Sequence, residues 1–408
     1  MSASRRSLAP APDPRLALGF LVLCAGALLA LVLAGTADDS SRWAFANRCD
    51  GRDAITYYYA AIAAQHGIDP YDLRAISSRF GVEALFVYPV FALPLFYPLT
   101  SFEPAVALMV FAGLRLICVA GLLALWARLL PVPGWVHLAI FTVGFGAAAV
   151  HDLCSANVVV FEALALWLGI AALWRGRAAG FPAWIALAAL PKLLWLALLP
   201  LALRRSPSGW RALAAAVALF AIAFAIWFVL WPQGVSAWFA NARLTTTFRY
   251  NVFTLLRGVV DMAGGDATGS YVTRIEAWGY LLWIALVGAV LLAAWRAGVG
   301  LRALSLLALV SLLAVWPGNL SYSWLPLLPA AVAAIFFLAV SGRHGWALVL
   351  TALCVWPQPL LEWLGPGNTM GQGTFASVLA VWASLATIVR RWPREFEAWL
   401  GGRAHGAD

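Results

Sequence analysis

Apolar runs of about 17 residues or more recur along almost the whole chain, and they restrict its possible folds more than any other feature. A run of this length can cross the hydrocarbon core of a bilayer as an α-helix. The charged fraction is 11%, against roughly 25% in soluble domains, so a soluble multidomain protein does not fit. We therefore predict an all-α polytopic membrane protein with one transmembrane domain over 15–391, between cytoplasmic tails at 1–14 and 392–408.

The apolar runs predict about 12 membrane-spanning helices. They cover 15–35, 84–99, 104–130, 135–150, 156–174, 181–203, 210–231, 277–296, 299–316, 324–341, 345–362 and 374–391. The second run contains Pro89, Pro94 and Pro98, so we expect it to be irregular or kinked. If the second or the sixth run formed a re-entrant hairpin, the number of spans would change.

Basic residues flank both ends of the hydrophobic region, with Arg5 and Arg6 before the first run and Arg394 after the last. Basic flanks stay on the cytoplasmic side of a membrane. Both ends are therefore expected inside, and the two long polar loops, 36–83 and 232–276, outside.

Neither the net charge of +9 nor the five cysteines indicate nucleic-acid binding, a disulfide framework or a metal site. The basic residues form short clusters at the ends of apolar runs, which is typical of topology signals and not of nucleic-acid binding. Only Cys49 lies in a long polar loop, so no disulfide framework is expected. No Cys-x-x-Cys pair or Cys/His cluster indicates a metal site.

A polar, acid-rich stretch at 48–71 directly follows the first apolar run. A helix of about 13 residues is expected here, from Asp53 to near Gly67, because Asp favours helix starts and Gly favours helix ends. Tyr57 would then lie one turn after Asp53, on the same face.

Asp53 is the first candidate for a catalytic base, because it lies in a water-exposed loop beside the membrane. The alternative is that Asp53 only caps a helix in a solvated loop. Asp50 and Asp69 are rival carboxylates in the same stretch.

The pattern Asp-x-x-x-Tyr-Tyr-x-Ala-Ala, followed by Gly and by Pro-Tyr, begins at Asp53 and ends at Tyr71. It resembles the first outside loop of glycosyltransferase family 87, and weaker matches in the same order extend over most of the chain. These weaker matches are Tyr88-Pro89, Asn157, Lys192 and Asn251. The sequence departs from the family in the loop before the tenth run. Many members carry Trp-x-His-Tyr there, whereas this chain has Tyr322 in that loop and no histidine.

The resemblance implies the glycosyltransferase C fold, with short interfacial helices in two long outside loops. It also implies transfer of a hexose, mannose above all, from a polyprenyl-phosphate sugar to a hydroxyl of a glycolipid or glycan acceptor in cell-envelope biosynthesis. The reaction would take place on the outer face of the plasma membrane, with inversion, no cofactor and Asp53 as general base. The oligomeric state stays open.

Binding of the donor phosphate needs fixed positive charge, for which arginine is well suited. The expected substrate-binding residues are Arg52, Tyr57, Tyr58, Tyr88, Lys192, Arg243, Arg249, Asn251, Arg257 and Tyr322. The alternative for each arginine is a solvated or headgroup-binding side chain. Arg115, Glu162 and Lys192 lie within apolar runs. The alternative to a binding role there is an internal ion pair of Glu162 with Lys192 or with Arg115.

Two other classes of function compete with the enzyme. A lipid or sugar transporter would gather its polar residues at the bilayer midplane on broken helices, whereas this chain concentrates acids in an outside loop. A structural scaffold would explain neither long loop. Within the enzyme class, a lipid-A-type or protein glycosyltransferase of the same fold stays open.

Overall fold

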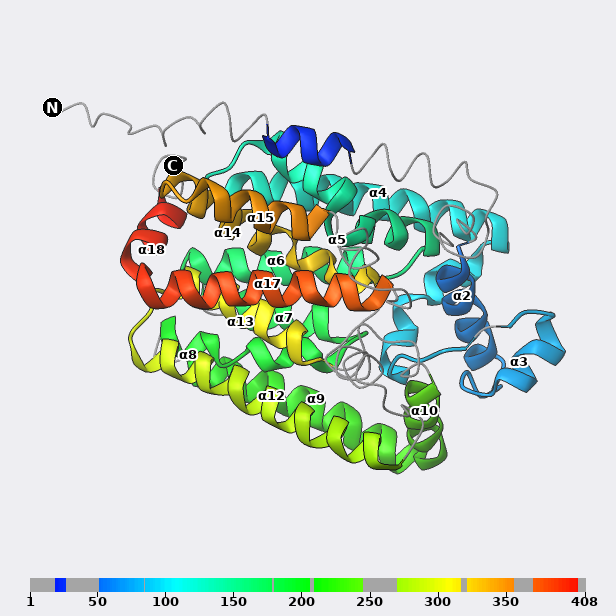
Figure 1. Cartoon of the computed structure of the whole chain (residues 1–408). Coiled ribbons are helices and arrows are strands. Elements are labelled where there is room, and N and C mark those ends of the chain that lie inside the picture. The colour runs from blue at the N-terminus through cyan, green and yellow to red at the C-terminus, as the bar shows by residue number, and fades with distance from the viewer. Residues whose placement is uncertain are drawn as a thin grey trace, which may run out of the picture. The chain divides into compact units, whose positions relative to one another are not determined.

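All regular secondary structure in the described part of the chain is helical (Figure 1). The computed structural model describes residues 19–26, 51–83, 85–177, 180–205, 209–244, 270–316, 321–355 and 370–402. The chain forms two compact units, and each is considered by itself. Unit 1 comprises Met1–Leu33, Leu123–Ala149 and Arg249–Asp408, and unit 2 comprises Ala34–Leu122 and Val150–Phe248.

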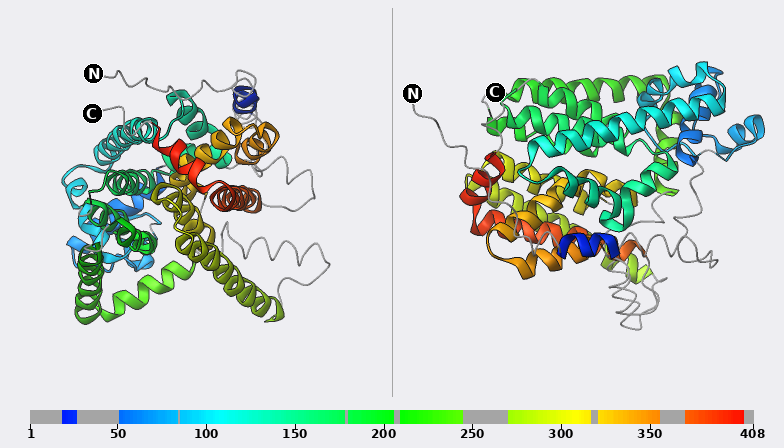
Figure 2. Two further views of the ribbon diagram at one scale, coloured as in Figure 1. Left: turned by 90° about the vertical axis from the view of Figure 1, so that its left-hand side faces the viewer. Right: turned by 90° about the horizontal axis from the view of Figure 1, so that it is seen from above.

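Unit 2 contains the acid-rich stretch and the helices that surround it. Its elements are α2 (Arg52–Gln65), α3 (Leu73–Phe80), η1 (Val90–Leu95), η2 (Tyr97–Ser101), most of α4 (Pro104–Leu129), the end of α5 (Gly134–Ser155), α6 (Val159–Trp174), α7 (Gly180–Ala189), η3 (Leu193–Leu198), α8 (Leu201–Arg205), α9 (Gly209–Leu230) and α10 (Pro232–Leu244). The short helices α2 and α3 lie together at the end of the unit where α4 begins (Figure 2).

Unit 1 is built around a helix that is buried along almost its whole length. Its elements are a helix over 19–26, the first part of α5, α12 (Ser270–Arg296), α13 (Leu301–Val315), η5 (Ser321–Leu327), α14 (Leu328–Val340), α15 (His344–Val355), α17 (Met370–Arg391) and α18 (Pro393–Gly401). The side chains from Leu328 to Ala339 are all buried, because α13, α15 and α17 pack around α14.

Several helices are long and apolar enough to cross a membrane. Among the described residues there are four: Pro104–Leu129, Gly209–Leu230, Trp278–Arg296 and Ser323–Val340. The number rises to six if the bent pairs Gly134–Phe145 with Ala148–Ser155 and Phe375–Arg391 with Pro393–Gly401 each count as one span. The protein is therefore polytopic, while the expected total of about 12 spans stays a prediction.

The expected positions of the apolar helices agree with the structure more closely than the expected number of spans. Each run predicted from residue 104 onward overlaps a described helix, and 181–203 overlaps the three short elements α7, η3 and α8. Of the run 345–362, only the part up to Val355 is described. The run at 84–99 forms no α-helix in its described residues. It contains η1, with Pro94 inside it, and the first residues of η2. The prediction that its prolines make it irregular is thus confirmed, since proline removes a helical hydrogen bond.

Large apolar side chains face outward on the long helices. On α4 these include Met109, Leu116 and Ile117, and on α9 they include Val229 and Leu230. Contiguous exposed apolar surface of this kind is unfavourable in water. In a bilayer the same surface contacts lipid, which agrees with the membrane assignment.

Helix α2 begins and ends where its local sequence predicts. Gly51 precedes it with a φ of 63°, a conformation that favours glycine. The helix ends at Gln65, followed by the cap His66 and by Gly67 with a φ of 71°. The expected range from Asp53 to near Gly67 was therefore correct to within two residues at each end.

Candidate active site

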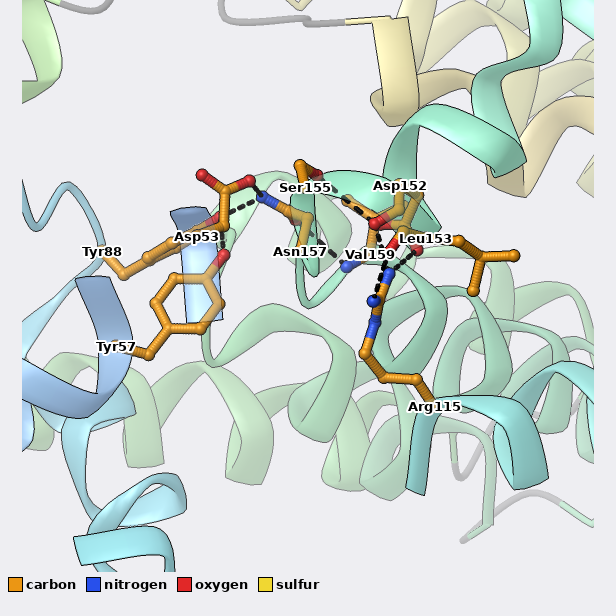
Figure 3. Close-up of polar contacts among 9 residues, drawn as sticks. All are labelled: Asp53, Tyr57, Tyr88, Arg115, Asp152, Leu153, Ser155, Asn157 and Val159. Atoms are coloured by element: carbon orange, nitrogen blue, oxygen red, sulfur yellow. Dashed lines mark hydrogen bonds and ion pairs between the residues drawn. The ribbon is translucent and has the colours of Figure 1, made fainter. Parts of the chain in front are cut away.

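Asp53 lies in the first turn of α2, and its side chain faces the turn that follows α5 (Figure 3). The amide Nδ2 of Asn157 donates a hydrogen bond to Asp53 Oδ2 at 2.7 Å. A further contact joins the two segments, because the backbone N–H of Gly51 donates to the carbonyl of Cys154 at 3.2 Å. The N-cap residue of α2 is Gly51 and no side chain caps it, which does not support the interpretation of Asp53 as a helix cap.

Two tyrosines continue the polar network away from Asp53. The hydroxyl groups of Tyr57 and Tyr88 lie 3.1 Å apart, and Asn157 Nδ2 also donates to the Tyr88 hydroxyl at 3.3 Å. Both tyrosine rings are buried, and the Tyr57 ring stacks on Phe96 with a centroid distance of 4.7 Å. The two tyrosine side chains are therefore held in fixed positions in the network next to Asp53. The Asp53 side chain itself stays partly exposed.

Burial raises the pKa of the Asp53 carboxyl above its ordinary value, because the charged form loses solvation. Hydrogen bonds from Asn157 and Ser155 act in the opposite direction, as do the positive charges of Lys192 and Arg52. A carboxylate with a raised pKa is a stronger base than a solvated one, provided that it is still ionised at the working pH.

A buried arginine contacts the turn that carries Asn157 (Figure 3). Arg115 on α4 forms an ion pair with Asp152, with Nη2 at 2.7 Å from Oδ2. The same guanidinium donates to the backbone carbonyls of Asp152 and Leu153. Arg115 and Asp152 are both almost fully buried, so this pair is part of the packed interior and not of the surface.

A second ion pair lies at a break between helices. Lys192 separates α7 from η3 in an extended conformation, and its Nζ is 3.3 Å from Glu162 Oε2 on α6. The indole of Trp195 also faces that carboxylate, at 3.4 Å. Glu162 is buried, whereas Lys192 keeps some exposure, so the lysine side chain is the more accessible partner.

The central region of the chain matches the sequence model of a known protein family. The sequence model of glycosyltransferase family 87 matches residues 86–317, which is more than half of the chain. The chain belongs to glycosyltransferase family 87. No curated protein sequence and no solved structure is significantly similar to it.

The family match covers part of the site of this family 87 glycosyltransferase. Tyr88, Asn157 and Lys192 lie inside the matched region, whereas Asp53 and Tyr57 precede it. The family confirms that the protein is a membrane glycosyltransferase. The catalytic role of Asp53 is not covered by the match and stays a proposal.

The structure brings only some of the predicted site residues together. Asn157 links Tyr88, and through it Tyr57, to Asp53, and Lys192 and Arg52 act on Asp53 through their charge. The hydroxyl of Tyr58 instead donates to the carbonyl of Phe102 at 2.8 Å. The side chains of Arg243, Arg249, Asn251, Arg257 and Tyr322 lie outside the described part of the chain.

The two rival carboxylates differ from Asp53 in their surroundings. Asp50 lies outside the described residues. Asp69 accepts a hydrogen bond from the backbone N–H of Tyr71 at 2.8 Å, so it stabilises the turn that follows α2. Among the described residues no group of three or more His, Cys, Asp or Glu side chains is placed to hold a metal ion.

Sequence reasoning missed three features of this site. Asn157 was seen only as a family match, and Asp152 was not singled out as a partner for Arg115. The expectation of no disulfide was wrong, because Cys154, three residues before Asn157, is disulfide-bonded. The thiols of Cys24, Cys118 and Cys354 are free. No local sequence signal marks the Asp53–Asn157 and Arg115–Asp152 contacts, since each joins residues far apart in the chain.

Proposed function

We propose that this glycosyltransferase moves a hexose, mannose in the first place, from a polyprenyl-phosphate sugar to a hydroxyl of a glycolipid or glycan. Membership of family 87 supports the general activity. The observation that carries the finer proposal is the Asp53–Asn157 hydrogen bond at 2.7 Å, which holds a partly exposed carboxylate against a buried polar network.

The chemistry needs one base and one stabilised leaving group. The acceptor oxygen attacks the anomeric carbon as its proton passes to Asp53, and the bond from that carbon to the phosphate oxygen breaks. The electron pair of this bond leaves with the polyprenyl phosphate, a weak base that needs charge stabilisation and no protonation. Attack on the face opposite the phosphate inverts the anomeric configuration, as in inverting glycoside hydrolysis.

Positive charge near Asp53 would hold the donor phosphate. Lys192 is the candidate inside unit 2, because its side chain is partly exposed, its ammonium lies beside a buried acid, and its charge acts on Asp53. Arg52 is exposed next to Asp53. The second long loop supplies further proposed contacts, which are Arg243, Arg249, Asn251 and Arg257. The first long loop supplies Tyr57 and Tyr58. The other two proposed contacts are Tyr88, from the run that follows the first loop, and Tyr322, from the loop before the tenth run.

A reconstituted assay tests the donor and the stereochemistry. We expect the purified protein in liposomes to transfer radiolabelled mannose from polyprenyl-phosphate mannose to glycolipids extracted from a host membrane. The new bond should have the anomeric configuration opposite to that of the donor, as seen by linkage-specific glycosidase digestion. Transfer from a nucleotide sugar, or retention of configuration, would contradict the proposal.

The same assay separates the enzyme from a transporter. The break at Lys192 within an apolar region is a feature that transporters also use. A transporter would move the labelled lipid-linked sugar across the bilayer without forming a new glycosidic bond. Movement without transfer would therefore favour the alternative of a lipid or sugar flippase.

We place the site on the extracytoplasmic face of the plasma membrane. The basic flanks of the chain support this topology. The disulfide at Cys154 supports it independently, because disulfides persist in oxidising compartments and are rare in the cytosol.

The topology and the disulfide can be tested together. Cys49 lies outside the described residues, and as the remaining cysteine of the sequence it is the partner that we expect for Cys154. Peptide mapping without reduction should recover the two cysteines in one linked species. A membrane-impermeant thiol reagent should then label Cys49 from outside only after reduction, and should not reach an Arg205→Cys variant. Labelling of that variant alone would reverse the topology.

A further inference from the structure

Both the nitrogen and the oxygen of the Asn157 side-chain amide form hydrogen bonds within the protein. Nδ2 donates to Asp53 Oδ2 at 2.7 Å and to the Tyr88 hydroxyl at 3.3 Å, while Oδ1 accepts from the backbone N–H of Val159 at 3.2 Å. A backbone N–H can only donate, so it sets which end of the amide faces Asp53. The side chain is 1% exposed, which leaves it almost no access to solvent or to a substrate.

The turn before Asn157 is also held in place (Figure 3). Ala156 has a φ of 56°, a left-handed conformation that is unfavourable for any residue with a side chain. The backbone N–H of Asn157 donates to the carbonyl of Asp152 at 3.3 Å, and the Arg115 guanidinium donates to the same carbonyl. Unfavourable backbone conformations of this kind persist only where the surrounding contacts impose them.

We infer that Asn157 is a positioning residue for the proposed reaction, and that its amide holds the Asp53 carboxylate in the orientation that accepts a proton from the acceptor hydroxyl. The inference rests on the proposed role of Asp53. Asn157 contacts the base and not the substrate, so its influence should be on the chemical step and its pH dependence. Donor binding should change little.

The charge of Asp53 also depends on this contact. The Asn157 hydrogen bond lowers the pKa of a carboxyl that burial raises. A general base must be ionised, so activity falls as the pH drops through the pKa of Asp53. Loss of the amide donor should move this acidic limb to higher pH, and a carboxylate in its place should move it further, because two adjacent carboxylates resist double ionisation.

The test compares the pH dependence of kcat for Asn157→Ala and Asn157→Asp with that of the wild type. Transfer is measured from radiolabelled polyprenyl-phosphate mannose to host-membrane glycolipids. Asn157→Ala should lower kcat at neutral pH by about 10–100-fold with little change in the KM for the donor. Asn157→Asp should shift the acidic limb upward by about 1–3 pH units, with activity partly recovered at high pH.

Asn241 provides a matched control in the same unit. It is a buried asparagine whose Nδ2 donates to the carbonyls of Tyr71 and Phe86, with no contact to Asp53. Asn241→Ala should lower thermal stability and leave the shape of the pH profile unchanged. If the Asn157 variants behave in the same way, Asn157 is merely structural and the inference is overturned.

An Asp53→Asn variant in the same experiment tests the proposed role of Asp53 as the base separately from the positioning role of Asn157. If it loses transfer while both Asn157 variants keep the wild-type pH profile, the proposed function stands and the positioning role fails. If it keeps transfer, the base is elsewhere and both fail. If the Asn157 variants do not accumulate, the conservative Asn157→Ser variant replaces Asn157→Ala, and it should show the same upward shift of the acidic limb.

Discussion

Replacement of Asp53 by asparagine is expected to reduce the rate of sugar transfer by about 10²–10⁴-fold, the range for loss of a general base. The substitution keeps the size of the side chain, and its carbonyl oxygen can still accept from Asn157. It removes only the ability to take up a proton. The variant should therefore insert, melt near the wild-type temperature and bind polyprenyl-phosphate mannose with nearly unchanged affinity. Transfer assays and ligand binding to the same preparation measure both effects.

The neighbouring carboxylates are the matched controls for this result. Asp69→Asn should be milder in activity, because Asp69 serves a local turn through the Tyr71 backbone. Asp50→Asn should also be mild. Wild-type transfer in Asp53→Asn, together with loss of transfer in either of the other two, would show that the base was assigned to the wrong residue of the loop. Activity in all three would favour the transporter.

Replacement of Arg115 by methionine should destabilise the protein by about 3–5 kcal/mol, the range for removal of one partner of a buried ion pair. The loss is large because Asp152 would remain as a buried carboxylate without its cation, and two backbone carbonyls would each lose one hydrogen bond. Unfolding of the purified protein by denaturant, in mixed micelles, measures the difference in free energy. Activity should fall with stability, since the same turn carries Asn157.

Two further variants make this prediction specific. The double variant Arg115→Met with Asp152→Leu should be destabilised less than Arg115→Met alone, because no buried charge is left unpaired. Arg128→Met removes an exposed arginine near the end of the same helix and should change stability by at most about 0.5 kcal/mol. Equal stability of Arg115→Met and the wild type would show that the pair does not hold the turn.

The sequence alone determined the local features of this protein. Long apolar runs located the helices, and the run predicted from Pro104 begins its helix at that proline. The helices that begin at Pro232 and Pro393 lie in stretches expected to be a polar loop and a tail, so their positions were not predicted. The three prolines of 84–99 excluded a regular helix there. These predictions succeeded because helix length, hydrophobicity and termini depend on residues that are neighbours in the chain. Recognition of the family succeeded for a related reason, since short motifs keep their order along the chain.

Only the tertiary structure decided which polar residues meet. The sequence left open whether Glu162 would pair with Lys192 or with Arg115. In the structure Glu162 pairs with Lys192, and Arg115 pairs with Asp152. Asp53 meets Asn157 across 104 residues of sequence. A buried charge must find a partner because burial without one is unfavourable. Which partner it finds depends on how the helices pack, and no pattern of spacing in this sequence carries that information.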